Sequence, residues 1–340
     1  MSSLPTDGWT RVKTIDAHTA GEPLRVITSG LPEILGDTIL ARRRWAEENL
    51  EPLRKALMHE PRGHADMYGC ILMPPATPDG DVGVLFLHNE GYSTMCGHGI
   101  IGLVKVGVEA GLLELDPEEP VVRIDTPAGR VTATAHLEGE RVARVSFENV
   151  PSFLLHRDLV IDTPTLGEVR CDVGFGGAFY AYVDASALGL ELAPSSLDRI
   201  ISMGREIKRA VSEGVELVHP TGEEDLNFLY GVIFVGPSAG SAHSRNVCVF
   251  AEGEVDRSPT GTGVSGRAAV HHARGELALG EVITIESLLG TTFDVEVLET
   301  CLVGELEGIV PRVTGSAHIT GQHEFVISPE DPLAEGFFLR

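Results

Sequence analysis

Two short turns of nearly the same sequence carry the residues most able to do chemistry. Residues 95–99 read Met-Cys-Gly-His-Gly, and residues 259–263 read Pro-Thr-Gly-Thr-Gly, so Thr260 takes the place of Cys96. Each turn leads into an apolar run with helical spacing. A cysteine at a helix start is typical of an activated thiolate, because the N–H groups and the positive end of the helix dipole lower its pKa. Two such turns facing each other would form an acid/base pair around one small anion, but threonine lacks usable proton chemistry, so we predict an asymmetric pair.

Each candidate residue also has an ordinary structural interpretation. A cysteine taken alone is more often a buried apolar residue, but the glycines around Cys96 and its place at a helix start favour function. Cys70 and Cys248 lie inside strand patterns and are predicted to belong to the core. His98 is either a surface histidine or a substrate contact. Asp256 is either a common acid near a helix start or the partner of a cationic amine.

Some sequence patterns resemble a dinucleotide-binding motif or a metal site, but the residues around them exclude both interpretations. Residues 261–266 match the dinucleotide pattern G-x-G-x-x-G, but that fingerprint needs a strand directly before it, and residues 256–259 read Asp-Arg-Ser-Pro. Glycines that open a helix still let backbone N–H groups bind an anion, and we expect a carboxylate there. The pairs at residues 16/18, 64/66 and 271/272 lack the histidine spacing or cysteine partners of a metal site. We therefore predict no metal and no cofactor.

Composition excludes several classes of partner. The 340 residues are 43% hydrophobic and 22% charged, enough for an ample core and more consistent with two domains than one. Acidic residues outnumber basic ones 50 to 26, which disfavours binding to nucleic acid or an anionic membrane. No apolar stretch is long enough to span a bilayer, and residues 1–14 lack a signal-peptide pattern. Five scattered cysteines without a Cys-x-x-Cys pair favour reduced thiols in the cytoplasm.

The chain reads as two copies of one unit, with the two turns about half its length apart. The first copy shows a helix at residues 38–57, kinked at Pro52, then strands at 68–73 and 82–87, a helix after the first turn and a strand at 121–124. In the second copy the matching segments are a helix at 194–213, strands at 230–235 and 247–251, a helix after the second turn and a strand at 282–285.

Because the segments recur in the same order, we predict an α/β (α+β) fold of two pseudo-symmetric halves. Each half is a strand-rich layer around a central helix, and the active site lies in the cleft between them. The first half is assigned to residues 1–145, with residues 325–340 returning to it, and carries Cys96. The second half, residues 146–324, carries Asp256 and Thr260.

Seven segments together resemble the proline racemase family, which also contains 4-hydroxyproline epimerases and trans-3-hydroxy-L-proline dehydratases. They cover nearly the whole chain, at residues 16–25, 60–67, 95–99, 125–129, 149–153, 175–181 and 256–263. The resemblance implies the fold of diaminopimelate epimerase and, in many family members, a homodimer. Racemases and epimerases of the family carry a second cysteine where this chain has Thr260, and threonine there is the pattern of the dehydratases.

The resemblance also implies a role for each site residue. Cys96 corresponds to the base that removes the α-proton, and Asp256 to the acid that holds the ring nitrogen. Backbone amides of Gly97, His98, Gly261 and Thr262 correspond to the cradle for the substrate carboxylate. Tyr68 and Phe250 occupy the positions of aromatic walls, although tyrosine at the first position departs from the family pattern.

Together these roles imply dehydration of trans-3-hydroxy-L-proline to Δ1-pyrroline-2-carboxylate, with a small imino acid as the only partner. Thr260 would position the departing hydroxyl, while His98, Thr260 or a bound water would protonate it. The alternatives are a 4-hydroxyproline epimerase or proline racemase that works with one thiol, and a non-catalytic imino-acid-binding protein.

Overall fold

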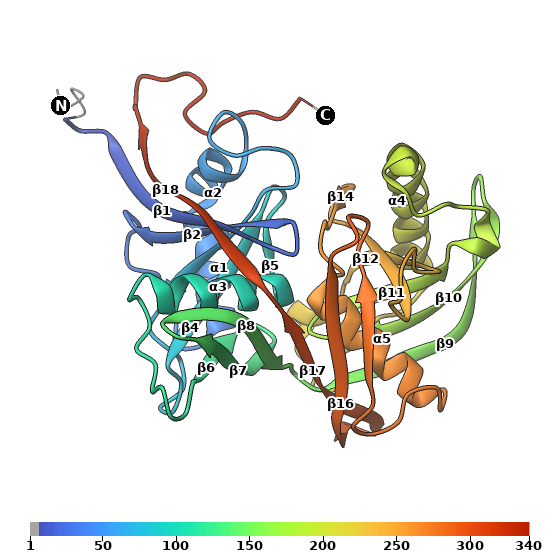
Figure 1. Ribbon diagram of the computed structural model, residues 1–340. Helices are drawn as coiled ribbons and strands as arrows, with labels where there is room; N and C mark the ends of the chain where they lie inside the picture. The colour runs from blue at the N-terminus through green and yellow to red at the C-terminus, as the bar shows by residue number, and fades with distance from the viewer. Residues whose placement is uncertain (1–6, 340) are drawn as a thin grey trace.

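The structure is a computed structural model that describes residues 7–339, and Figure 1 shows two lobes lying side by side. Residues 1–6, which belong to the segment analysed for a signal peptide, and residue 340, the end of the segment predicted to return to the first half, lie outside the described residues. No helix of residues 7–339 is long and apolar enough to cross a membrane.

We call the elements of the first lobe the first repeat. It contains three helices and nine strands of the described chain: β1 (Thr10–Thr19), β2 (Glu22–Ser29), α1 (Ile39–Asn49), α2 (Glu51–Met58), β3 (Tyr68–Met73), β4 (Val82–His88), β5 (Tyr92–Ser93), α3 (Gly97–Glu109), β6 (Val121–Thr126), β7 (Gly129–Glu138), β8 (Arg141–Glu148) and β18 (Ala317–Ile327). The predicted helix at residues 38–57 is confirmed with its break, because Pro52 lies in the first turn of α2.

The elements of the second lobe form the second repeat. They are β9 (Ser152–Thr163), β10 (Gly167–Phe175), β11 (Phe179–Asp184), η1 (Ser186–Leu188), η2 (Pro194–Ser196), α4 (Leu197–Gly214), η3 (Glu224–Leu226), β12 (Leu229–Gly236), β13 (Ser244–Phe250), β14 (Glu254–Val255), α5 (Gly261–Ala273), β15 (Val282–Glu286), β16 (Thr292–Val303) and β17 (Leu306–Gly315). The predicted helix at residues 194–213 is therefore confirmed as η2 followed by α4.

Strand pairing shows that the two repeats share one topology. In the first, β2 pairs parallel with β3, β3 antiparallel with β4, and β4 parallel with β6. In the second, β11, β12, β13 and β15 pair in the same order and the same directions. The predicted pseudo-symmetric α+β fold is confirmed.

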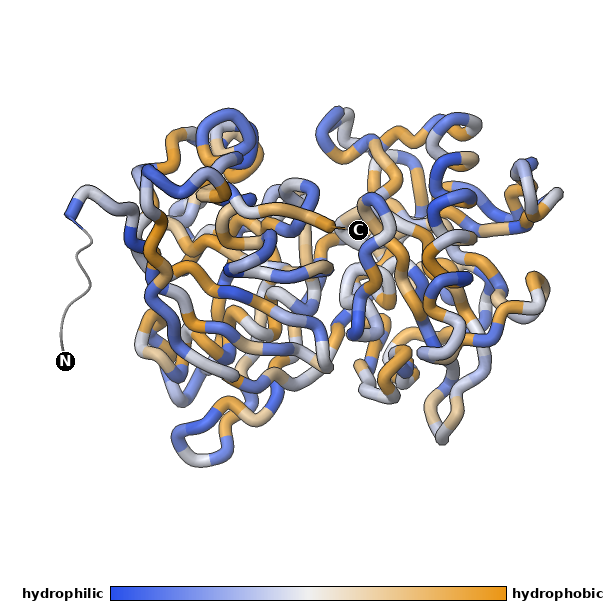
Figure 2. The backbone as a smooth tube through the Cα atoms, turned by 90° about the horizontal axis from the view of Figure 1, so that it is seen from above, coloured by the Kyte–Doolittle hydropathy of each residue, from blue (hydrophilic) through white to orange (hydrophobic). Residues whose placement is uncertain are grey.

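Each repeat encloses one apolar helix, α3 in the first and α5 in the second. Ten of the thirteen residues of each helix are buried, as expected for a helix that is covered on all sides. Seen from above in Figure 2, both lobes carry hydrophobic segments through their interior, while many outer loops are hydrophilic. The buried surface around α3 and α5 holds the start of each helix in a defined place.

A strand pairing joins the repeats, because β17 of the second repeat pairs antiparallel with β8 of the first. The chain then crosses back, and β18 pairs with β1 inside the first repeat from Thr10 to Thr19. The returning strand begins at Ala317, earlier than the predicted residue 325, and the predicted boundary at residues 145/146 falls inside β8. The division into two independent halves stays a proposal.

Candidate active site

Helices α3 and α5 meet at their first residues. A Cβ atom placed on Gly97 would lie 2.4 Å from the Cα atom of Gly261, and one placed on Gly261 would lie 2.5 Å from the Cα atom of Gly97. Real Cβ contacts are not this short, so only glycine allows the two backbones to approach so closely. The contact brings the residues that precede the two helices, Cys96 and Thr260, to one place.

A small enclosed cavity lies at this contact. All nine predicted site residues line it, and the complete lining is Tyr68, Met95, Cys96, Gly97, His98, Tyr180, Tyr230, Cys248, Phe250, Asp256, Thr260, Gly261 and Thr262. Cys96 and Thr260 are each only 4% exposed. The structure therefore places both predicted members of the pair at a single cavity between the repeats.

The cavity is closed in this conformation. Its free volume is about 10 Å³, which is at the lower limit for a single water molecule. A proline-sized molecule needs far more space, so residues that line the cavity must shift before a substrate can enter.

Three groups surround the sulfur of Cys96. The Gly99 backbone N–H donates to Sγ at 3.3 Å, the His98 ring nitrogen Nδ1 lies 3.2 Å away, and the Tyr68 hydroxyl also hydrogen-bonds the thiol. The sequence predicted a lowered pKa for Cys96, and the structure corrects this. Burial raises the pKa of the Cys96 thiol well above its usual value, and the Gly99 and Tyr68 hydrogen bonds only partly offset that rise.

A test follows from the raised pKa of Cys96. The base must be a thiolate, so a raised pKa moves its ionisation to more alkaline pH and leaves little of the active form near neutrality. We expect kcat with saturating substrate to rise steadily between about pH 7 and about pH 10. Steady-state rates at saturating imino acid check this, and a kcat that is already at its plateau near about pH 6.5 would contradict it.

His98 is held as a neutral ring. Burial lowers its pKa, and the ring also hydrogen-bonds Pro23, which has only a backbone carbonyl to offer. A neutral imidazole has one N–H, and the tautomer that hydrogen-bonds Pro23 donates it to that carbonyl. The other ring nitrogen is then an acceptor.

Thr260 differs from Cys96 in conformation as well as chemistry. Its backbone φ is +69°, which is rare for a β-branched residue and costs on the order of 1–3 kcal/mol. Unlike Cys96, its side chain does not cap the helix that follows. The Thr260 hydroxyl is buried against the thiol of Cys248, a weak hydrogen-bond partner that leaves most of its hydrogen-bonding capacity free. A bound molecule is the natural partner for such an atom.

The two helix starts also present backbone donors. The first N–H groups of a helix have no partner within the helix, so the amides of Gly97 and His98 in α3 and of Gly261 and Thr262 in α5 can receive an anion. Both helix dipoles point their positive ends to the same cavity. The arrangement suits one carboxylate.

Carboxylates gather on the side of Asp256. Its Oδ1 accepts the Ser258 N–H at 2.7 Å, and Glu22 of the first repeat accepts the Arg257 N–H at 2.6 Å. Glu22 is fully buried, and burial, followed by the negative charge of Asp256, raises its pKa well above normal. This wall is suited to a cationic ring nitrogen.

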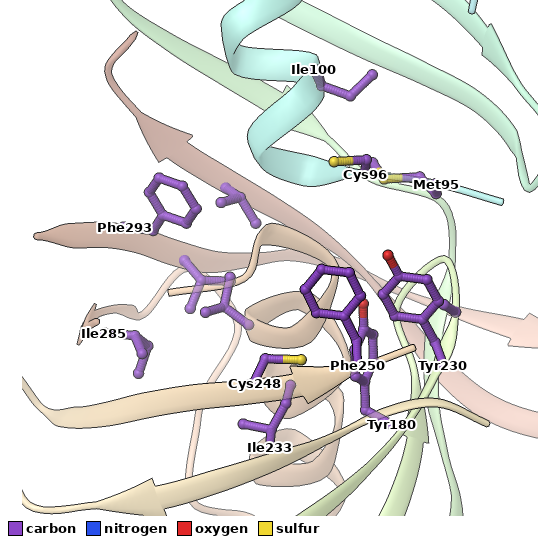
Figure 3. Packing of buried hydrophobic residues seen from close by; sticks show 14 of the residues in the cluster. Met95, Cys96, Ile100, Tyr180, Tyr230, Ile233, Cys248, Phe250, Ile285 and Phe293 are labelled. Atoms are coloured by element: carbon purple, nitrogen blue, oxygen red, sulfur yellow. The ribbon is translucent and has the colours of Figure 1, made fainter. Parts of the chain in front are cut away.

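Aromatic rings close the rest of the cavity. Phe250 and Tyr230 stack at 5.3 Å between ring centroids, and Figure 3 shows both below Cys96 and Met95. The Tyr68 and Tyr230 hydroxyls, one from each repeat, lie 3.2 Å apart. Met95, Tyr180, Tyr230 and Cys248 also line the cavity, although none of them was predicted as a site residue from the sequence. The repeat offered one signal, because Tyr230 occupies the position in β12 that Tyr68 occupies in β3.

The described part of the chain contains no group of three or more His, Cys, Asp or Glu residues arranged to hold a metal ion. The cavity itself offers one thiol, one imidazole and one carboxylate next to the two helix starts, beside a second thiol at Cys248. This set can move protons and bind a small zwitterion.

The chain is similar over nearly its whole length to several known proteins. Residues 14–338 match the model of the family described as proline racemase. The chain is 48% identical over 338 residues to a trans-3-hydroxy-L-proline dehydratase of Colwellia psychrerythraea, which covers 99% of this chain and 95% of the relative. It is 45% identical over 330 residues to a 3-hydroxyproline 2-epimerase of Burkholderia multivorans, covering 97% and 98%. A crystal structure of a hydroxyproline epimerase from Agrobacterium vitis with bound trans-4-hydroxy-L-proline matches with a TM-score of 0.91 at 31% identity, covering 97% and 96% of the two chains.

Proposed function

The chain belongs to the proline racemase family, and on that basis we propose that it is a hydro-lyase that dehydrates trans-3-hydroxy-L-proline to Δ1-pyrroline-2-carboxylate without a cofactor. One observation carries the proposal. The paired helix starts of α3 and α5 bring Cys96 and Thr260 to one cavity, so the site has a thiol from one repeat and a hydroxyl from the other.

Removal of the α-proton is the difficult step. A proton next to a carboxylate is weakly acidic, and negative charge grows on the carboxylate as the proton leaves. The amides of Gly97, His98, Gly261 and Thr262 are fixed donors at that position. A single donor of this kind is typically worth roughly 3 kcal/mol in the transition state. Asp256 binds the ring nitrogen, and Cys96 takes the proton as a thiolate.

Thr260 decides what happens to the carbanion. Inversion needs an acid with a pKa near the working pH on the second face of the ring, and a threonine hydroxyl is far too weak an acid. The carbanion therefore expels the hydroxyl from the neighbouring carbon. The resulting enamine tautomerises to the cyclic imine.

Incubation with trans-3-hydroxy-L-proline tests this function. We expect the imine, detected with o-aminobenzaldehyde, and no accumulation of an inverted amino acid. The second candidate is an epimerase, favoured by the similarity to the Burkholderia multivorans protein. Inverted optical rotation without imine would establish that candidate instead and reject the dehydratase.

Replacing Thr260 with cysteine is expected to add stereoinversion. The new thiol supplies the missing acid, and a positioned acid typically contributes about 10²-fold or more. Chiral chromatography of L-proline incubations should show D-proline at least about 100-fold above the parent, since proline has no hydroxyl to expel. Thr260→Ser is the matched control and should form none. A folded Thr260→Cys variant that still dehydrates but forms no D-proline would reject the paired-site account.

All five cysteines, at positions 70, 96, 171, 248 and 301, are free thiols. A site that depends on a reduced thiol works best in a reducing compartment, which supports the proposal of a cytoplasmic enzyme.

A further inference from the structure

The stereochemistry of the proposed substrate restricts where its hydroxyl can leave, and this inference rests on the proposed function. In a trans-3-hydroxy-L-proline ring the hydroxyl and the carboxylate lie on opposite faces. The α-hydrogen is also opposite the carboxylate, so the α-hydrogen and the hydroxyl share one face. The group that protonates the departing hydroxyl must therefore lie on the side of the base, next to Cys96.

This geometry changes the role expected for Thr260. The repeats are related by pseudo-symmetry, and Cys96 and Thr260 precede the equivalent helices α3 and α5 on the two sides of the Gly97–Gly261 contact. Thr260 then faces the ring from the side opposite the leaving hydroxyl. Its role is then negative: it cannot protonate the carbanion on the face opposite Cys96, so inversion does not occur.

Two side chains besides the thiol itself stand beside Cys96 on its own face. His98 is one, and its ring nitrogens Nδ1 and Nε2 lie 3.2 and 3.7 Å from the sulfur. In the tautomer that donates its single N–H to the Pro23 carbonyl, the ring offers the sulfur only an acceptor. Tyr68 is the other. Its ring packs edge-on against the His98 ring at 4.7 Å between centroids, and its hydroxyl contacts the Cys96 thiol.

The surroundings of the Tyr68 oxygen make its proton available. Ser93 Oγ lies 2.5 Å from this oxygen and the Tyr230 hydroxyl lies 3.2 Å from it. A phenol oxygen has one proton and two acceptor sites. Either oxygen can be the donor in each contact, and when Ser93 and Tyr230 donate, the Tyr68 proton is free to point into the cavity. The same two donors then stabilise the phenolate that forms when the proton leaves.

We propose that Tyr68 is the catalytic acid that protonates the leaving 3-hydroxyl, and that Cys96 then returns a proton to it. The Cys96 thiolate removes the α-proton, the C2–H electron pair forms the C2=C3 bond, and the C3–O bond breaks. The departing oxygen takes the Tyr68 proton and leaves as water. The Cys96 thiol, which now carries the α-proton, passes it to the Tyr68 phenolate. Both side chains are restored, and the net change is loss of one water.

Burial supports this direction of proton transfer. It raises the pKa of Tyr68 well above normal, so the phenol stays protonated until a strong base forms beside it. Departing hydroxide is such a base, because water is a much weaker acid than a phenol. A phenolate is intrinsically a stronger base than a thiolate, so the Tyr68 phenolate can recover a proton from the Cys96 thiol.

Tyr68→Phe tests the acid role, with trans-3-hydroxy-L-proline and trans-3-fluoro-L-proline as paired substrates. Fluoride can leave without being protonated, whereas hydroxide needs a proton to leave. We expect kcat for dehydration to fall by about 100-fold or more, and kcat for fluoride loss to stay within about threefold of the parent. Tyr92→Phe is the matched control, because its hydroxyl faces the Ala46 carbonyl outside the cavity, and it should leave both rates unchanged.

The outcomes separate this inference from the proposed function. If the parent forms no imine from the hydroxylated substrate, the proposed function fails. If the parent is active and Tyr68→Phe dehydrates within about threefold of it, the acid role is overturned while the function stands. An equal loss with both substrates also overturns it, because a residue that only shapes the cavity would slow both reactions alike.

Discussion

Replacing Cys96 with serine is expected to lower kcat for dehydration by about 10³-fold or more, because a serine hydroxyl cannot ionise under conditions in which a thiol can. The substitution is nearly isosteric, and serine can still accept the Gly99 N–H that now reaches the sulfur. Folding and carboxylate binding should therefore survive. Imine formation measures the loss, and the tritium or deuterium content of the α-position after incubation in labelled water should fall in parallel.

The matched control is Cys301→Ser. Cys301 is free and lies outside the cavity, so this variant carries the same chemical change away from the site and should keep the parent rate. A Cys96→Ser protein with more than about a tenth of the parent kcat would remove Cys96 as the base. It would leave the cradle formed by the two helix starts untouched.

Gly97→Ala is expected to damage the site by a steric route. The new methyl group would lie 2.4 Å from the Gly261 Cα atom and 3.0 Å from the Phe147 ring, and neither backbone can give way without separating α3 from α5. A displacement of about 1 Å at reacting groups can cost about 100-fold in rate. We expect kcat/KM to fall by at least that factor, with a lower midpoint of thermal unfolding.

Gly214→Ala provides the comparison. Gly214 ends α4, and a Cβ atom there would meet nothing within 4 Å, so this variant should keep its activity and its unfolding temperature. A Gly97→Ala protein with parent-like kcat/KM would show that the close contact of the two helix starts is not needed. The proposal that the backbone amides of Gly97, His98, Gly261 and Thr262 accelerate the reaction would then be rejected.

The elements of the fold were predictable because their signals are local. The 3.6-residue spacing of apolar residues in α4, and the proline that starts α2, are both readable within one segment. The repeat added order to these segments, since a second copy of each appears at about half the chain length. All nine predicted site residues line the cavity for a related reason, because most of them lie in the two glycine-rich turns that begin the central helices.

Other properties depend on groups that are distant in sequence. Tyr180 and Cys248 lie within strands that read as core, and only the packing of the two repeats turns them towards the cavity. The returning strand begins at Ala317 because its partner is β1, at the other end of the chain. Pairing partners so far apart leave no local pattern that marks where a strand starts.

The sequence by itself determined the chemistry of the site, since a thiol at one helix start and a hydroxyl at the other are properties of Cys96 and Thr260 alone. The tertiary structure decided how that chemistry is tuned. The pKa of Cys96 is raised rather than lowered, because the packing of the two repeats removes the thiol from water and that effect exceeds the hydrogen bonds from Gly99 and Tyr68. The same packing also brings the hydroxyls of Tyr68 and Tyr230 together from separate repeats. Desolvation and contacts across an interface depend on many residues that are distant in sequence, so they cannot be predicted from any single segment.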